Sequence, residues 1–165
     1  MISLASKHRL DEDQTGSTRP NHGLVVYVKD GIPVTRLHSH KFDGIEIIII
    51  QAEIKQTEIQ VVFLYKTPKL GQQQFIKTLT DSIQPYVGRN KPLFILGDFN
   101  INLIDRPNMI TQYMEDKHSC RQIISEPTTC YKTLLDHVYT NETNVQAGVI
   151  PAYWSDHCLI FCIKQ

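Results

Sequence analysis

The stretch PLFILGDFN, residues 92–100, is an apolar run that ends in a polar turn. A short apolar run bounded by turn residues is typical of a strand buried on both faces of a sheet. GDFN alone is also common in ordinary turns, because glycine is permissive and the side chains of Asp and Asn bond their own backbone. The stretch therefore predicts a short buried strand whose end presents Asp98 and Asn100 from a rigid scaffold.

Strand patterns recur on both sides of this stretch. Residues 45–54 (IEIIIIQAEI) are apolar at nearly every position, and residues 58–66 (EIQVVFLYK) form a second such run. The three residues between them, 55–57, predict a tight hairpin connection. The other segments with a strand pattern are residues 22–31 (HGLVVYVKDG), 134–140 (LLDHVYT), 146–150 (QAGVI) and 157–164 (HCLIFCIK).

Two segments have the pattern of helices. Apolar residues from Phe75 to Tyr86 fall at helical spacing with polar residues between them. Residues 107–119 form a weaker helical pattern, with Pro107 near its first turn. About six strands and two helices, with many strands adjacent in sequence, favour an α/β (α+β) fold. We expect a mixed sheet or sandwich with helices packed outside it rather than a regular βαβ repeat.

The first residues, MISLASKHRLDEDQTGSTRPNH (1–22), are polar and mixed in charge, which predicts a loop or a frayed terminus. We therefore expect a polar N-terminal segment over residues 1–20 and one domain over residues 21–165. Residues 38–40 (HSH) could form a pair of metal ligands on a strand. Because no further ligand stands nearby in the sequence, we predict a solvated loop there instead.

The composition of the 165 residues limits the classes of protein that fit. With 41% hydrophobic residues the chain can bury a sizeable core. The balance of 17 Lys+Arg against 17 Asp+Glu lacks the basic excess of many nucleic-acid-binding proteins, although a local basic groove stays compatible with it. The four cysteines form no CxxC pair and no secretory segment precedes them, so we expect reduced thiols in an intracellular protein. No apolar run approaches the length of a membrane span.

Polar groups stand at three further strand ends. Asp136 lies inside the apolar LLDHVYT, where a buried carboxylate needs a donor, and a histidine is the natural one. Asp156 and His157 precede the apolar CLIF, which by itself suits a strand-entry cap with an incidental histidine. Tyr65 ends VVFLY, a position where most tyrosines are core residues with the hydroxyl at the surface. The four groups in this order are more specific than any one of them.

Phosphodiester hydrolysis is a chemistry that these groups could share. It requires an activated water, and it requires stabilisation of charge on the phosphoryl and leaving oxygens. Asp98 can orient or deprotonate the water, and Asn100 can hold water or a phosphate oxygen. His157, if protonated, can donate to the phosphate while Asp136 fixes its tautomer and charge.

Three other residues complete this hypothesis. Asp156 offers the hard oxygen ligand that Mg²⁺ prefers, and Tyr65 can donate its phenolic proton to the phosphate. Several lysines could flank the phosphate-binding cleft, or they could be scattered solubilising residues. These are Lys66, Lys69 and Lys132.

GDFN, then LDHVYT, then SDH before a last apolar strand resemble the endonuclease/exonuclease/phosphatase superfamily, which has the deoxyribonuclease-I-like fold. The resemblance implies a four-layered α/β sandwich of two mixed sheets flanked by helices. It implies Mg²⁺ or Mn²⁺ as the cofactor, with Asp156 as a metal ligand. The residues to which it assigns catalytic roles are Tyr65, Asp98, Asn100, Asp136 and His157.

Within that superfamily, HGLVVYVKDG, VVFLYKTP, PTTCYKTLLDHVYTN and AYWSDHCLI look like endonuclease domains of mobile elements, either non-LTR retrotransposons or helitron-like transposons. The resemblance implies DNA as the partner, through its phosphodiester backbone, and an intracellular, nuclear location. It does not imply a membrane. It also allows for further domains in a longer mobile-element protein.

The chain departs from the family at its N-terminal side. Family members begin with a strand that carries an Asn, and a later strand ends in a Glu that is the principal metal ligand. Neither motif precedes residue 22, so we expect these N-terminal strands to be missing and the chain to represent the C-terminal part of the domain. The acidic residues 11–13 have no apolar strand ahead of them. Lys66 stands where relatives usually have Arg. A lysine keeps the positive charge but lacks the planar guanidinium group that binds phosphate through two hydrogen bonds.

Three functions stay open. The first is a metal-dependent endonuclease acting on DNA. The second is a catalytically dead remnant that only binds nucleic acid or a partner, because the N-terminal Asn and Glu are not found. The third is a phosphatase of the same superfamily that acts on a small phosphoester.

Overall fold

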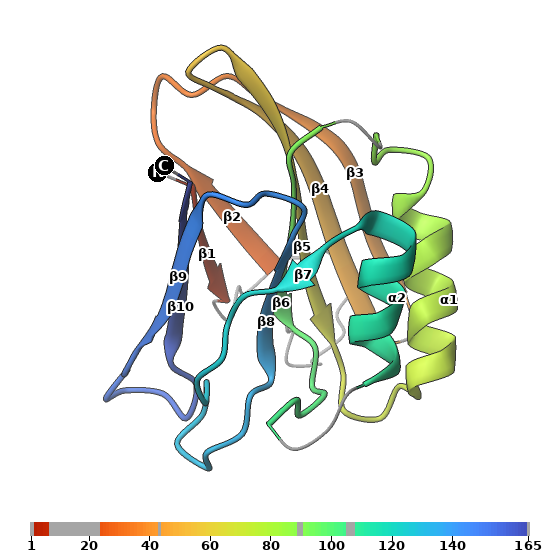
Figure 1. The fold of residues 1–165 in the computed structure, drawn as a ribbon, viewed down its shortest axis with the longest axis vertical. Coiled ribbons are helices and arrows are strands. Elements are labelled where there is room, and N and C mark those ends of the chain that lie inside the picture. The colour runs from red at the N-terminus through yellow and green to blue at the C-terminus, as the bar shows by residue number, and fades with distance from the viewer. Residues whose placement is uncertain (1, 7–23, 43, 89–90, 105–107, 165) are drawn as a thin grey trace, which may run out of the picture.

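The computed structural model describes residues 2–6, 24–42, 44–88, 91–104 and 108–164. Its centre is a six-stranded sheet with the strand order β3-β4-β5-β6-β8-β7 (Figure 1). These strands are β3 (Val34–Phe42), β4 (Ile45–Ile54), β5 (Thr57–Lys66), β6 (Leu93–Asp98), β7 (Arg121–Gln122) and β8 (Asp136–Thr140). The pair β5–β6 is parallel and the other pairs are antiparallel, so the sheet is mixed, as predicted.

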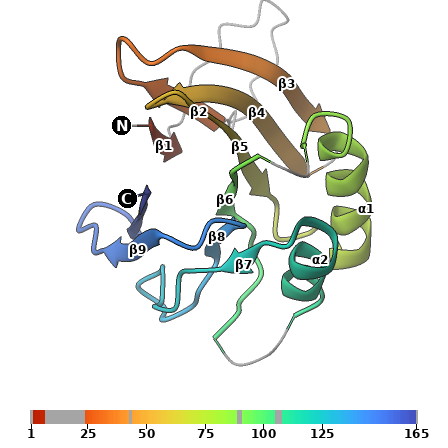
Figure 2. The ribbon, with the colours of Figure 1, turned by 45° about the horizontal axis from the view of Figure 1, so that its top comes forward.

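Two helices, α1 (Gln72–Ile83) and α2 (Met109–His118), cover one face of this sheet (Figures 1 and 2). The predicted apolar stripe of α1 is the face that packs, since Phe75, Leu79 and Ile83 are fully buried against β4, β5 and β6. Each such side chain contributes roughly 1.5–3 kcal/mol of burial free energy. Helix α2 begins at a cap, where Asn108 Oδ1 accepts a hydrogen bond from the backbone N–H of Ile110 at 3.2 Å.

Two small antiparallel sheets cover the opposite face. One pairs β1 (Ile2–Ser6) with β2 (Leu24–Val28), and the other pairs β9 (Val145–Ile150) with β10 (Leu159–Lys164). Val26 of β2 and Cys162 of β10 pack against a cluster that includes Val61 and Phe63 of β5. The central strands are therefore buried on both faces, which explains their nearly continuous apolar sequences.

The arrangement confirms an α/β sandwich of a mixed sheet, a second set of strands and helices. In the described residues both helices lie on the same side of the six-stranded sheet (Figure 2). Neither of the helices in these parts of the chain is long and apolar enough to span a membrane. All four cysteines are free, as expected.

The structure corrects two loop predictions. Ile2–Ser6 form β1 and pair with β2, so the prediction of a loop is wrong for these residues, and a strand does precede the acidic residues 11–13. Those acidic residues lie outside the described parts of the chain. The segment His38–His40 belongs to β3, where the ring of His38 stacks on Tyr86 with centroids 4.7 Å apart. Both strands were missed because each is held largely by backbone pairing and lacks a long apolar run.

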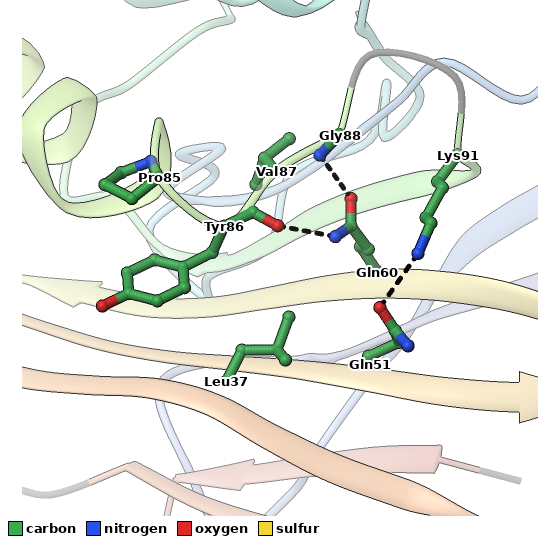
Figure 3. Close-up of a pocket in the computed structure, with 8 residues that line it drawn as sticks. All are labelled: Leu37, Gln51, Gln60, Pro85, Tyr86, Val87, Gly88 and Lys91. Atoms are coloured by element: carbon green, nitrogen blue, oxygen red, sulfur yellow. Dashed lines mark hydrogen bonds between the residues drawn. The ribbon is translucent and has the colours of Figure 1, made fainter.

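A cleft of about 370 Å³ lies between the β3–β5 region and the segment that follows α1 (Figure 3). Its polar side chains are already hydrogen-bonded to the wall. Gln60 Nε2 donates to the carbonyl of Tyr86 at 2.6 Å, and Gln60 Oε1 accepts from the N–H of Gly88 at 2.9 Å. Lys91 Nζ donates to Gln51 Oε1 at 3.2 Å. We infer a structural role, because these bonds tie the exit of α1 to β5.

Gly97 permits the close approach of β5 and β6. It pairs with Leu64 in the parallel ladder and has φ +148°. A Cβ atom at this position would lie 1.8 Å from the carbonyl oxygen of Leu64. The glycine of GDFN is therefore required by the backbone of the neighbouring strand, in addition to any preference for a turn.

We predict that Gly97→Ala destabilises the fold by about 3 kcal/mol, because the methyl group collides with backbone that cannot rotate away and the φ angle is unfavourable for alanine. Chemical denaturation followed by circular dichroism measures the change. Gly71→Ala is the matched control, because a Cβ at Gly71 meets nothing within 4 Å. Equal stability of the two variants would contradict the prediction.

Candidate active site

Three of the predicted site residues form a row across the six-stranded sheet. Tyr65 of β5 pairs with Asp98 of β6, and Asp98 in turn pairs with Asp136 of β8. Directly paired residues of a sheet point to the same face and lie about 4.5–5.5 Å apart at Cβ. The strand register therefore brings together three side chains that are far apart in the sequence.

His157 joins this row from the segment that leads into β10. Its Nδ1 donates a hydrogen bond to Asp136 Oδ2 at 2.8 Å. The predicted contact between the carboxylate of Asp136, which is partly buried, and the histidine is confirmed. The carboxylate fixes the orientation of the ring through Nδ1, so Nε2 is the ring nitrogen that can contact another group.

The loop before β8 fastens His157 to the sheet. Thr129 forms an isolated bridge with His157, and the N–H of Cys158 donates to the carbonyl of Thr128 at 2.7 Å. On the other side, the N–H of Cys130 donates to the carbonyl of Asp156 at 2.9 Å. Residues 128–130 and 156–158 thus form a short ladder that holds the histidine in place.

Thr128 is a positioning residue that the sequence interpretation missed. Its side chain is fully buried, and Oγ1 accepts hydrogen bonds from the backbone N–H groups of Leu135 and Asp136, each at 3.0 Å. One hydroxyl therefore sets the start of β8, while the carbonyl of the same residue holds Cys158. The only signal in the sequence is a threonine in the turn-rich PTT, which is weak because threonine bonds nearby backbone in many turns.

Burial and mutual repulsion perturb the carboxylate of Asp98. Burial, followed by the negative charge of Asp136, raises the pKa of Asp98 to about 6. The hydrogen bond from the backbone N–H of Asn100 lowers the pKa of Asp98, and so do the positive charges of His157 and Lys66. Asp98 is consequently ionised at neutral pH but stays close to the range in which it exchanges a proton.

His157 is perturbed in the direction that keeps it charged. The hydrogen bond to Asp136 raises its pKa to about 9, and the charges of Asp136, Asp98 and Asp156 add to the rise against the opposing effect of burial. At neutral pH the ring is an imidazolium that can donate from Nε2. Asp98 is ionised and His157 is protonated together between about pH 6 and pH 9.

Asn100 braces Asp98. It adopts a left-handed conformation with φ +47°, and its N–H donates to Asp98 Oδ1 at 2.9 Å. Its Nδ2 donates to the carbonyl of Lys66 at 2.7 Å and to Asp98 Oδ2 at 3.1 Å. Both amide hydrogens are therefore used inside the protein. The contact of Asn100 with water or phosphate stays a prediction. Because both amide hydrogens are used, Oδ1 is the side-chain atom that would make this contact, as an acceptor.

The remaining predicted residues lie around this centre. Tyr65 is half-buried, and burial followed by the charge of Asp98 raises the pKa of its hydroxyl. Asp156 is exposed beside His157. Lys66 is 2% exposed, with Nζ donating to the carbonyl of Thr67 at 2.9 Å. Burial lowers the pKa of Lys66, and Asp98 opposes that shift. The catalytic and metal-binding roles of Tyr65 and Asp156 stay predictions.

His137, which follows Asp136 directly, is a second structural residue that the sequence did not reveal. Its ring is fully buried and stacks on Phe99 with centroids 4.4 Å apart. Nε2 donates to the carbonyl of Ile101 at 2.9 Å. Burial lowers the pKa of His137 to about 4, so this ring is neutral at pH 7. Its contacts with Phe99 and Ile101 stabilise the GDFN turn.

The donor set fits a divalent cation. Ligand atoms of Asp98, Asp136 and His157 all lie within 4.8 Å of one another, and they are the one group of three such residues found in the described parts of the chain. Because Nδ1 of His157 is bonded to Asp136, the available donors are carboxylate oxygens, which Mg²⁺ and Mn²⁺ prefer. The repulsion that raises the pKa of Asp98 is the kind that a bound cation relieves.

We predict that Asp136→Asn lowers the pKa of His157 from about 9 towards or below its usual 6.5, because the charge partner is lost and burial remains. Proton NMR titration of the imidazole measures this. The raised pKa contributes stability that is complete below about pH 6.5 and is lost as the pH rises through about 9, so thermal unfolding should lose that pH dependence in the variant. Asp116→Asn, on the exposed face of α2, is the control.

We further predict that Thr128→Val costs about 2 kcal/mol, since two partly buried backbone N–H groups lose their acceptor while the shape of the side chain is kept. The His157 pKa should fall in the same variant, because Asp136 is no longer held in place. A purely structural role would move the unfolding curve and leave the NMR titration unchanged. Thr35→Val, at an exposed position of β3, is the control.

Comparison with known proteins identifies the fold. The endonuclease domain of TRAS1, a telomere-specific non-LTR retrotransposon, aligns with a TM-score of 0.69 at 15% identity, over 99% of this chain and 78% of that one. An endonuclease/exonuclease/phosphatase family protein from Leptotrichia buccalis aligns with a TM-score of 0.61 at 14% identity, over 97% and 69%. The catalytic domain of human Nocturnin aligns with a TM-score of 0.59 at 13% identity, over 99% and 72%.

A search of curated protein sequences found no match. The sequence model of the Endonuclease/Exonuclease/phosphatase family, in contrast, matches residues 4–157, which include all six predicted site residues from Tyr65 to His157. Because this match spans most of the chain and the fold agrees with it, the protein belongs to the endonuclease/exonuclease/phosphatase family.

Proposed function

We propose that this protein is a metal-dependent phosphodiesterase of the endonuclease type that acts on DNA and derives from a mobile element. The observation that carries the proposal is the hydrogen-bonded pair of Asp136 and His157 beside Asp98 at the ends of adjacent strands. The mobile-element origin rests on the resemblance of the flanking sequences, and the fold shared with the TRAS1 endonuclease domain agrees with it.

Asp98 is the group suited to activate the attacking water. Its pKa of about 6 lies close to neutral pH, where a carboxylate is ionised yet still accepts a proton readily. Asn100 holds both carboxylate oxygens, so the orientation of Asp98 is set before substrate arrives. The half-buried hydroxyl of Tyr65, which stays protonated because its pKa is raised, can donate to the phosphate.

His157 is the group suited to stabilise negative charge on the phosphoryl oxygens. Its imidazolium is held by Asp136 through Nδ1, which leaves the Nε2–H as a donor. A preorganised cation in a partly buried site stabilises developing charge more strongly than one in water. Through this hydrogen bond Asp136 positions the histidine ring.

The carboxylates of Asp98, Asp136 and Asp156 are the residues that would hold Mg²⁺ or Mn²⁺. When bound, the ion would neutralise charge on the phosphate and assist departure of the leaving oxygen. DNA as the substrate would place the protein in the nucleus. The exposed Lys69 and Lys132 could then contact neighbouring phosphates.

One observation favours a second candidate, a remnant that binds nucleic acid without cleaving it. The strand β1, ISLAS, carries no carboxylate, although the family resemblance implies a metal-binding Glu at the end of an N-terminal strand. The two candidates share the fold and differ in turnover, so one experiment separates them.

We predict that the purified protein nicks supercoiled plasmid in the presence of Mg²⁺ or Mn²⁺, and that His157→Ala lowers the rate by about a hundredfold or more. His38→Ala, a histidine of β3 outside the site, should leave the rate unchanged. Gel electrophoresis of the plasmid over time measures both. A wild-type rate no higher than that of His157→Ala would favour the inactive remnant, and cleavage of small phosphoesters without DNA nicking would favour a phosphatase.

A further inference from the structure

Three aromatic side chains are the most exposed large apolar groups in the described parts of the chain. Tyr153 is 96% exposed, Trp154 is 78% exposed and Tyr131 is 76% exposed. Most other exposed apolar residues lie on strands and expose about half of their area or less. Rings this exposed contribute little to the fold, and amphipathic aromatic side chains are enriched at binding surfaces.

The three rings belong to two loops that are bonded to each other beside the candidate active site. Tyr131 follows Cys130, whose N–H donates to the carbonyl of Asp156 at 2.9 Å. Tyr153 and Trp154 directly precede the segment that contains Asp156 and His157. Two residues separate Trp154 from His157, and three residue steps of extended chain can span at most roughly 10 Å.

This position limits what the rings can meet. A polymer whose phosphodiester lies at His157 carries its sugars and bases within the same distance, so the groups that reach the aromatic loops are bases. Inside a duplex the faces of the bases are already stacked, whereas an unpaired base offers a free π-face to an aromatic side chain. The exposed Lys132, next to Tyr131, adds a cation for the adjacent backbone.

We propose that Tyr131, Tyr153 and Trp154 form a base-stacking platform that binds unpaired nucleotides of a DNA strand next to the scissile phosphate. The inference rests on the proposed function and names its substrate form: DNA with a single-stranded or locally unpaired segment at the cleavage site. Binding comes from stacking and is independent of base identity, because every base has a π-face.

Trp154 is the single tryptophan of the chain, so its fluorescence reports on the platform directly. A short oligodeoxythymidine is titrated into the full chain in the presence of EDTA, which prevents hydrolysis. We expect the emission to be quenched on binding and the indole to be shielded from acrylamide. An abasic oligonucleotide of the same length, which keeps the phosphates and lacks the bases, should produce neither effect, and a blunt duplex should produce much less.

Variants test the contribution of each ring. Tyr131→Ala and Tyr153→Ala should each weaken binding of the oligodeoxythymidine by about tenfold, the usual loss for one stacked base. Tyr131→Phe and Tyr153→Phe keep the rings and should bind as the wild type does. Tyr27→Ala removes an exposed tyrosine from β2, which packs against β4 and β5, and serves as the control.

Equal quenching by the abasic oligonucleotide would overturn the platform, because contact with phosphates alone would explain the binding. An unchanged emission with the oligodeoxythymidine, or a response to lipid vesicles alone, would overturn it as well. These results are separable from those for the proposed function. If the protein nicks plasmid but its fluorescence is not quenched, only the proposed platform is contradicted. If its fluorescence is quenched but it does not nick plasmid, only the proposed catalytic activity is contradicted.

Discussion

The hydrogen bond between Asp136 and His157 links the two halves of the sandwich. Asp136 begins β8 of the six-stranded sheet, whereas His157 leads into β10 of a small sheet on its face. Burying a carboxylate without a hydrogen-bond donor costs free energy, and a nearby negative charge favours the protonated form of a histidine. The carboxylate of Asp136 therefore stabilises the charged form of His157, whose pKa it raises. The packing of β9–β10 on the sheet holds the two residues in contact.

The site concentrates negative charge in a way that works against the stability of the fold. Asp98 and Asp136 are direct partners across the β6–β8 ladder, and this repulsion, together with burial, raises the pKa of Asp98 to about 6. Ionising Asp98 costs folding free energy as the pH rises from about 4 to about 6. The imidazolium of His157 and the hydrogen bonds from Asn100 offset part of the cost. A charge arrangement of this kind is typical of functional sites, where it serves reactivity.

Sequence patterns predicted the central strands well, because burial on both faces produces long apolar runs such as residues 45–54. They missed β1 and β3, whose pairing depends on the backbone and carries little periodic signal. At the site, the polar residues at strand ends marked Asp98, Asp136 and His157. They did not mark Thr128 or His137, because a threonine in a turn and a histidine in a strand occur in many proteins for unrelated reasons.

The sequence by itself determined the family and the types of chemical group at the strand ends, since GDFN, LD and SDH are short contiguous motifs that can be recognised in the sequence alone. Only the tertiary structure decided that the amide of Asn100 is hydrogen-bonded to Asp98 and to the carbonyl of Lys66, and that the carbonyl of Leu64 requires a glycine at position 97. It also decided that the loop with the exposed Tyr131 is hydrogen-bonded to the segment that contains His157. The reason is that these relations join residues on different strands and loops. They depend on strand register and on backbone distances, which one-dimensional patterns do not encode.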